Sequence, residues 1–242
     1  MIEFDAIVLK STPFQESDKM VTAISSDRTH SFLARGVMKL ESKNAPSVLD
    51  FSLSHFEITK GQKGETLRRG SLIESFQKAK EDIVSLSVLD FIKEITIKLV
   101  PDSDSFKIYP FLEKSLHLLN NGFSPFSVVL IYFAKMLDIS GYALNVNNSD
   151  RSGSKKDIVG LSFSDGGFVS RNDFDELNDK KLELEELKVL RYIFLVDLTN
   201  YGEVNLEEKC NPFSILSILS EFLYYVSQTK LNSLELCRRV VK

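Results

Sequence analysis

The first 76 residues consist of short apolar-rich segments separated by turn residues, a pattern typical of β-strands. Pro13, Asn44-Ala45-Pro46 and the glycines at 61 and 64 are among the residues that interrupt it. The pattern predicts strands over residues 4–10, 20–25, 30–36, 49–60 and 66–76. About five strands in so short a segment favour an OB-type barrel, and an SH3-like barrel fits the same pattern nearly as well.

The fourth predicted strand, residues 49–60, changes phase along its length. Leu49, Phe51 and Leu53 share one parity, whereas Phe56 and Ile58 share the other. We expect a one-residue slip near His55, as in a β-bulge, because bulges let a strand curl around a barrel.

From about residue 78 the apolar period becomes helical. Helices are predicted from 78 to the proline at 101, and then over 106–120, 125–139, 183–199, 213–227 and 231–239. The expected fold is therefore α+β. An OB-fold domain over 1–77 precedes a helical bundle domain over 78–242, which carries an irregular β-hairpin-like insert at about 145–173.

The insert contains two pairs of polar residues with the spacing of zinc ligands. Ser149-x-x-Ser152-Gly153 has the form of a C-x-x-C-G knuckle, and Gly166-Gly167-x-x-Ser170-x-x-Asp173 has the form of G-G-x-x-C-x-x-C. Serine hydroxyls are poor zinc ligands, and one aspartate cannot replace four thiolates. A plain hairpin loop with coincidental spacing explains the pattern equally well, and either interpretation predicts no structural zinc.

The charge balance excludes a general attraction to polyanions. The net charge is -4, residues 1–76 hold ten basic and ten acidic residues, and residues 77–242 hold 20 basic and 24 acidic ones. Nucleic-acid binding would therefore depend on a local patch, and the first segment is the better place for one. Two cysteines, no apolar run of bilayer length and an acidic N-terminus lead us to expect a reduced, cytoplasmic protein.

Several segments together resemble the RecO family of recombination mediators. They are Ile7-Val8-Leu9-Lys10 with the following 13–19, Ala34-Arg35-Gly36-Val37-Met38-Lys39 with Ser42-Lys43, Gly141-Tyr142 before the insert, and 221–234. The resemblance implies binding of single- and double-stranded DNA, annealing of complementary strands and partnership with RecR. It also implies binding of the acidic tail of single-strand-binding protein, so that recombinase can load on coated DNA. Many members carry a zinc ribbon at the insert, where this chain has serines and an aspartate.

The candidate DNA-binding residues are cations of the strand-rich segment. They are Lys10, Lys19, Arg35, Lys39, Lys43, Arg68 and Arg69. Strand ends and loops of a barrel present such cations to a phosphate backbone, although a solvated loop with scattered charge is the alternative. Arg68 and Arg69 are neighbours in a strand, so we expect at most one of them in a given groove. Phe14 and Phe32 are candidate stacking residues, although phenylalanine in a small barrel is more often core.

A dock for an acidic peptide tail requires an apolar notch edged by cations. Lys188 and Arg191 lie on one face of a predicted helix near Leu187 and Leu190, and they are the candidates for this dock. The pair 238–239 is a second option, and an ordinary solvated helix face explains either pair.

No sequence motif indicates catalysis. The three histidines are isolated from one another, and phosphate-loop, zinc-protease and serine-hydrolase motifs are missing. We expect no catalytic residue, no cofactor and no enzymatic activity. Two other hypotheses compete with a recombination mediator. One is a protein-binding adaptor with little DNA affinity, and the other is an unrecognised hydrolase or transferase.

Overall fold

The computed structural model describes residues 1–62, 64–99 and 101–240. Contacts divide the chain into two compact units. The barrel unit comprises Met1–Glu81 with Pro101–Asn120, and the helical unit comprises Asp82–Val100 with Asn121–Lys242.

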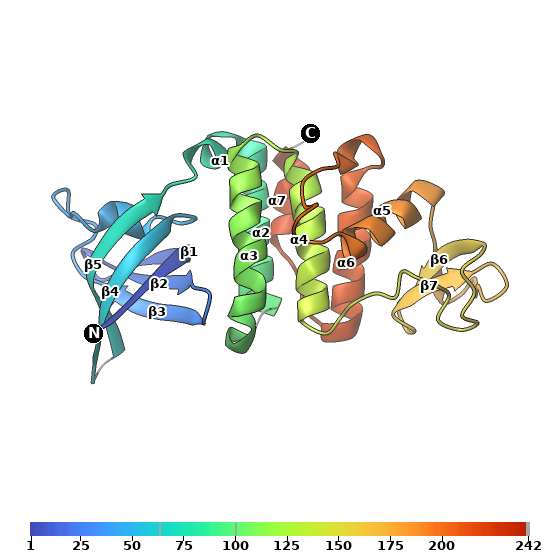
Figure 1. Cartoon of the computed structure of the whole chain (residues 1–242), viewed down its shortest axis with the longest axis horizontal. Helices are drawn as coiled ribbons and strands as arrows, with labels where there is room; N and C mark the ends of the chain where they lie inside the picture. Colours follow the sequence, from blue (N-terminus) through green and yellow to red (C-terminus); the bar gives the residue numbers. More distant parts are fainter. Residues whose placement is uncertain (63, 100, 241–242) are drawn as a thin grey trace. The chain divides into compact units, whose positions relative to one another are not determined.

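Five strands close into a barrel in the order β1-β2-β3-β5-β4 (Figure 1). They are β1 (Ile2–Phe14), β2 (Asp18–Ile24), β3 (Thr29–Ala34), β4 (Leu53–Gly61) and β5 (Gly64–Glu74). All neighbours are antiparallel except β3 and β5, which pair in parallel and close the barrel. The predicted OB-type barrel is confirmed.

The barrel core is built around three aromatic rings. The ring centroid of Phe32 lies 5.1 Å from that of Phe56, and Phe4 lies 5.9 Å from Phe56 at the edge of the cluster. Small and branched residues from all five strands fill the remaining space, as expected where alternate residues face inward. Phe32 is only 1% exposed, so it belongs to the core and offers no ring face for stacking.

The irregularity predicted near His55 lies mainly on the opposite strand. The inward residues of β4, Ser54, Phe56 and Ile58, keep a regular alternation. The β4–β5 register shifts on either side of His55, and at both places the extra residue belongs to β5. The apparent change of phase arose because residues 49–52 form a turn after the short 3-10 helix η1 (Ala45–Val48), before β4 begins.

Two helices belong to the barrel unit, so the units differ from the predicted boundary at 77/78. These are α1 (Gln77–Glu81) and α3 (Ser105–Asn120), the latter preceded by the 3-10 turn η2 (Asp102–Asp104). The Lys78 amide donates to the Asn120 side chain at 3.1 Å. The His117 ring meets Phe76 edge-on at 5.1 Å, and its Nδ1 lies 3.6 Å from Glu74. These contacts hold the C-terminal end of α3 against the end of β5 and against α1.

The helical unit is organised around α4 (Pro125–Ile139), which is buried along almost its whole length. Its neighbours include α2 (Ile83–Leu99), α5 (Leu184–Leu195) and α6 (Pro212–Ser227), while α7 (Ser233–Val240) packs on α2 (Figure 1). Ser124 caps α4 by accepting a hydrogen bond from the Ser127 amide at 3.2 Å, with Pro125 at the first position as predicted. Among the described residues, no helix combines the length and the apolar character needed to cross a bilayer.

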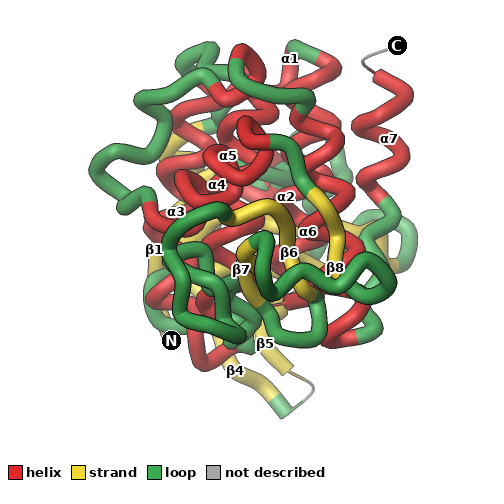
Figure 2. The backbone as a smooth tube through the Cα atoms, turned by 90° about the vertical axis from the view of Figure 1, so that its right-hand side faces the viewer, coloured by secondary structure: helices red, strands yellow, loops and turns green. Residues whose placement is uncertain are grey.

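The predicted hairpin-like insert forms β6 and β7 of a small sheet in the order β7-β6-β8, and the sheet extends beyond the predicted end at about 173 to include β8 (Figure 2). Its strands are β6 (Ile158–Ser162), β7 (Gly167–Ser170) and β8 (Asp179–Lys181). Phe163 anchors the sheet to α6, where its ring contacts Phe222 and Tyr225 at centroid distances of 5.8 and 6.1 Å.

Candidate nucleic-acid interface

Three of the predicted DNA-binding cations line one groove of about 630 Å³ on the barrel, which we call the basic groove. They are Lys43, Arg68 and Arg69, and the only acidic side chain among the described lining residues is Glu57. Glu57 lies 3.8 Å from Arg68, a long contact between an exposed arginine and a partly buried carboxylate. The groove therefore keeps an excess of positive charge suited to a phosphate backbone.

A β-bulge explains why both arginines enter this groove. Glu57 pairs with Arg69 and Ile58 pairs with Leu67, so Arg68 is an extra residue on β5. A bulge interrupts the alternation of side chains, and both arginines are exposed. The expectation that at most one of them could point into a given groove was wrong for this reason.

Lys43 reaches the same groove because its loop is fastened to β5. The Asn44 side chain accepts a hydrogen bond from the Gly70 amide at 3.0 Å. Ser47 also packs directly on Gly70, where an added Cβ would lie 2.9 Å from the Ser47 Cβ and still closer to its hydroxyl. Gly70 is therefore the residue that lets the loop approach the strand beside Arg69.

Arg35 lies in a second groove of about 690 Å³, which we call the Phe14 groove. Asp18 and Glu65 line it as well, and Glu65 is paired with Arg28 at 3.2 Å. The Phe14 ring is 42% exposed and contributes apolar surface. Because the charges of this groove nearly cancel, it suits a protein surface better than a polyanion.

The other predicted cations of the barrel line neither groove in the described part of the chain. Lys10 is exposed on β1, and Lys19 is the second residue of β2, opposite Ala34. Lys39 folds over Gly36, in the loop between β3 and η1. The seven candidates therefore do not form one surface.

Sequence reasoning missed two exposed apolar residues in that loop. Leu40 is fully exposed and Met38 is 48% exposed, close in sequence to Lys39 and Lys43. The available signal was an isolated apolar pair among charged residues, without strand or helix periodicity. Exposed apolar side chains beside cations are suited to contact nucleic-acid bases.

The predicted tail-binding cations also lie in a groove, in the helical unit. Lys188, Arg191, Tyr192 and Leu195 line a space of about 620 Å³. Asp197 and Glu203 line it too, and Lys188 is paired with Glu185 at 2.7 Å. The groove has the expected apolar and cationic residues, but its acidic residues reduce the positive potential.

The two cysteine thiols and the buried His30 lie in surroundings that favour their uncharged forms. Burial raises the pKa of Cys210 and of Cys237, and the Cys237 thiol contacts the Ser87 carbonyl at 3.3 Å. Burial lowers the pKa of His30, whose ring stacks on Phe4 at 3.6 Å. Among residues 1–62, 64–99 and 101–240, no group of three or more histidine, cysteine or acidic residues is placed to hold a metal ion.

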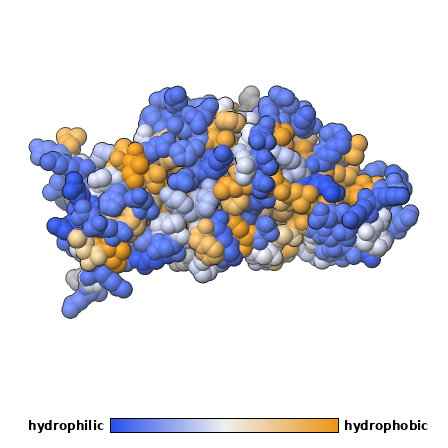
Figure 3. All heavy atoms as spheres, viewed as in Figure 1, coloured by the Kyte–Doolittle hydropathy of each residue, from blue (hydrophilic) through white to orange (hydrophobic). Residues whose placement is uncertain are grey.

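On the face in Figure 3, hydrophilic residues predominate and hydrophobic ones form separate patches.

Two family models together match most of the chain. The model described as "Recombination protein O N terminal" matches residues 1–76, and "Recombination protein O C terminal" matches residues 80–235. The chain belongs to the RecO family. In this RecO-family chain the N-terminal match covers the whole barrel, including both of its grooves.

Curated relatives agree with this assignment. The chain is 28% identical over 209 residues to the DNA repair protein RecO of Bacillus cytotoxicus, covering 85% of this chain and 84% of the relative. It is 29% identical over 208 residues to the DNA repair protein RecO of Bacillus mycoides, covering 84% of each. The similarity therefore extends through both units of this RecO-family chain.

Proposed function

We propose that this chain is a non-enzymatic mediator of DNA repair and recombination that binds single- and double-stranded DNA through its barrel. The observation that carries the proposal is the basic groove, where Lys43, Arg68 and Arg69 outnumber Glu57, the one acidic side chain among the described lining residues. Phosphate contacts of this kind bind DNA with little dependence on its sequence. Membership of the RecO family and the names of the relatives support the same role.

Annealing of complementary strands follows from the same binding of phosphates, and it requires no covalent bond to be formed or broken. Cations that screen the phosphates of two strands let complementary bases pair, and base pairing supplies the free energy. Leu40 and Met38, beside Lys39, provide apolar surface for bases that are temporarily unstacked. Loading of recombinase on DNA coated with single-strand-binding protein is the cellular step in which this activity is used.

The two remaining grooves are assigned to protein partners. The Phe14 groove, with exposed Phe14 and charges that nearly cancel, is the proposed contact for RecR. The groove with Lys188 and Arg191 is the proposed dock for the acidic tail of single-strand-binding protein. A role in DNA repair and the two free cysteines support a location in the cytoplasm, associated with the nucleoid.

Salt-dependent binding of labelled single-stranded DNA tests the basic groove. In the variant Lys43→Ala/Arg68→Ala/Arg69→Ala we expect affinity at low salt to fall at least about tenfold, and the slope of log K against log[salt] to fall by about 2. The matched control is Lys155→Ala/Lys156→Ala/Lys209→Ala, which removes the same charge from exposed positions outside the barrel. It should bind DNA nearly as the parent does.

A second pair of measurements separates the mediator from the protein-binding adaptor. The adaptor predicts no DNA binding by the parent even at low salt, whereas the mediator predicts strong binding that weakens steeply with salt. Arg35→Ala should reduce binding of RecR more than binding of DNA. A larger loss of DNA affinity in this variant than in the basic-groove variant would assign the DNA to the Phe14 groove instead.

A further inference from the structure

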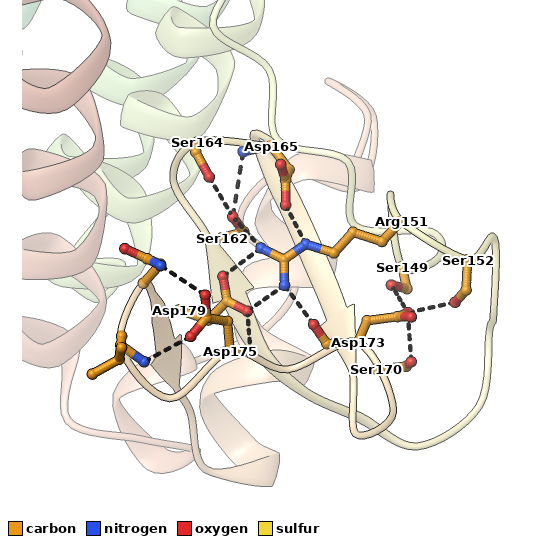
Figure 4. Close-up of polar contacts among 12 residues, drawn as sticks. Ser149, Arg151, Ser152, Ser162, Ser164, Asp165, Ser170, Asp173, Asp175 and Asp179 are labelled. Carbon is orange, nitrogen blue, oxygen red and sulfur yellow. Dashed lines mark hydrogen bonds and ion pairs between the residues drawn. The ribbon is translucent and has the colours of Figure 1, made fainter.

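Four side chains of the insert converge on one point, although they come from two separated segments. The Oδ2 atom of Asp173 accepts hydrogen bonds from the Ser149 hydroxyl at 2.5 Å, from the Ser170 hydroxyl at 2.7 Å and also from the Ser152 hydroxyl (Figure 4). Ser149 and Ser170 are buried, so these hydroxyls form part of the interior of the insert. A single carboxylate oxygen is thus surrounded by three donors.

The backbone brings the four residues together in two turns. In the first turn the Gly153 amide donates to the Ser149 carbonyl at 2.8 Å, with Gly153 in the left-handed region at φ +73°. In the second the Asp173 amide donates to the Ser170 carbonyl at 3.0 Å. Each turn therefore holds residues i and i+3 side by side, which is how paired x-x-spaced ligands approach a tetrahedral ion in a zinc ribbon.

The lengths of the side chains explain what occupies the centre. A serine hydroxyl is attached to Cβ at the same position as a cysteine thiol, so the three hydroxyls lie where three thiolates would lie. Aspartate is one atom longer, so its oxygen extends to the point at which an ion would be held. The donors lie 2.5 and 2.7 Å from this oxygen, close to the roughly 2.3 Å of a zinc–sulfur bond.

The donor set does not fit zinc. Three neutral hydroxyls and one carboxylate are poor ligands for an ion that is held by thiolates and imidazoles in structural sites. We propose that the insert is a zinc-ribbon-like fold in which the Asp173 carboxylate takes the place of the metal ion, so that the insert folds without one. Hydrogen bonds to an ionised acceptor are stronger than neutral ones, which suits them to this role.

The state of the carboxylate agrees with this arrangement. The hydroxyls of Ser149, Ser152 and Ser170 lower the pKa of Asp173 below its ordinary value. The group is therefore charged at neutral pH and accepts all three donors.

Arg151 reinforces the centre from inside the first turn. Its guanidinium forms a two-point ion pair with Asp179, at 2.7 and 2.8 Å, and its Nε donates to Asp165 at 2.7 Å (Figure 4). The same guanidinium donates to the backbone carbonyl of Asp173. One side chain thus connects the first turn to the second, to the β6–β7 turn and to β8.

The alternative is an ordinary hairpin loop in which the ligand-like spacing is coincidental. Such a loop gives no reason for Ser149, Ser152, Ser170 and Asp173 to share one centre, whereas a retained ribbon fold requires it. A substitution that restores thiolates distinguishes the two.

The first experiment asks whether the positions form a tetrahedral site. The full chain carrying Ser149→Cys/Ser152→Cys/Ser170→Cys/Asp173→Cys should bind one Co²⁺, with the absorption of tetrahedral cobalt thiolate, and Zn²⁺ should displace it. The controls are the half sites, Ser149→Cys/Ser152→Cys and Ser170→Cys/Asp173→Cys. We expect the complete set to bind at least about 100-fold more tightly than either half. Equal affinity of a folded complete variant and its halves would overturn the proposal.

The second experiment uses the native side chains and applies even if the four-cysteine variant does not fold. Asp173→Asn keeps the size of the side chain but removes the charge, and should speed amide hydrogen exchange over 149–173 by about tenfold. Asp157→Asn, an exposed position in the same insert, is the control and should change little. The parent protein, analysed for metal and then treated with chelator, should hold substoichiometric zinc and keep its exchange pattern. Stoichiometric zinc whose removal opens the insert, or an unchanged pattern in Asp173→Asn, would refute the proposal.

Discussion

The barrel and the insert are both built from β-strands, but different contacts join their segments. The barrel closes around Phe32, Phe56 and aliphatic residues, and its ionic side chains lie outside. The insert buries apolar residues such as Leu161 and Val169 as well, but its turns are joined by hydrogen bonds and ion pairs of Asp173 and Arg151. Apolar burial is non-directional and depends little on pH, whereas charged hydrogen bonds depend on geometry and ionisation.

This difference explains which region is suited to which role. Because the barrel is held together by its apolar core, its surface loops and cations can be substituted without loss of the fold. Lys43 and Arg68 can therefore be specialised for binding. In the insert the charged contacts of Asp173 and Arg151 join the turns to the sheet, so their replacement should loosen the insert locally. Mutations should therefore separate the two regions by size of effect and by sensitivity to conditions.

The largest effect is expected from Phe56→Ala in the barrel core. Removal of this fully buried ring should lower the free energy of unfolding by about 3–5 kcal/mol, because the neighbouring rings cannot fill the cavity. Urea unfolding followed by circular dichroism measures the change, with the exposed Phe106→Ala as control. A loss no greater than that of the control would contradict an apolar barrel core.

A smaller effect is expected from Gly70→Ala on β5. The added methyl group meets Ser47, so stability should fall by about 1–3 kcal/mol as the loop shifts. Because this loop carries Lys43, DNA affinity should fall with stability. Ser71→Ala, on the exposed surface beside it, is the control, and normal DNA affinity in folded Gly70→Ala would show that loop position is unimportant.

Arg151→Lys should produce a local effect in the insert. Lysine keeps the charge but cannot form the two-point pair with Asp179, so local stability should fall by about 0.5–1 kcal/mol, as for partly exposed ion pairs. Hydrogen exchange should quicken in the insert while barrel amides stay unchanged. Arg171→Lys, exposed in the same region, is the matched control. Equal rates of amide hydrogen exchange in the two variants would show that Arg151 does not connect the segments of the insert.

The mildest test is acidification of the unmodified protein. Three serine hydroxyls lower the pKa of Asp173, and the pKa of Asp179 is lowered by Arg151 although burial opposes the shift. A lowered pKa in the folded state means that the stabilisation is complete above the ordinary aspartate pKa of 3.8 and is lost as pH falls through the folded value. Protection factors in the insert should therefore fall below about pH 4 before those of the barrel core. If the barrel core lost its protection at a higher pH than the insert, the insert would not be the region that depends more on ionised side chains.

Local sequence patterns predicted much of the fold. Alternating apolar residues located the five barrel strands, and helical periodicity with Pro125 and the Ser124 cap located α4. The strand prediction failed at Phe51, which is buried in a turn at positive φ rather than in β4. Periodicity records that a residue is buried, but not which element buries it.

The candidate sites were predicted in part. The cations were chosen from sequence, but the grouping of Lys43 with Arg68 and Arg69 depends on a bulge and on contact between distant residues. Arg35 was one of the candidates for phosphate contact, yet its groove also contains Asp18 of β2 and Glu65 of β5, which only the folded barrel brings beside it. Leu40 was overlooked because sequence pattern cannot tell an exposed apolar loop residue from a buried one.

The sequence by itself determined the barrel, the helices and the ligand-like spacing of the insert, because each depends on the local order of polar and apolar residues. Only the tertiary structure decided which cations share a groove and that Asp173 forms the centre of three hydroxyls. These arrangements join residues far apart in the chain, as between Ser149 and Asp173. Their geometry is set by strand register and turn conformation, which local propensities do not specify.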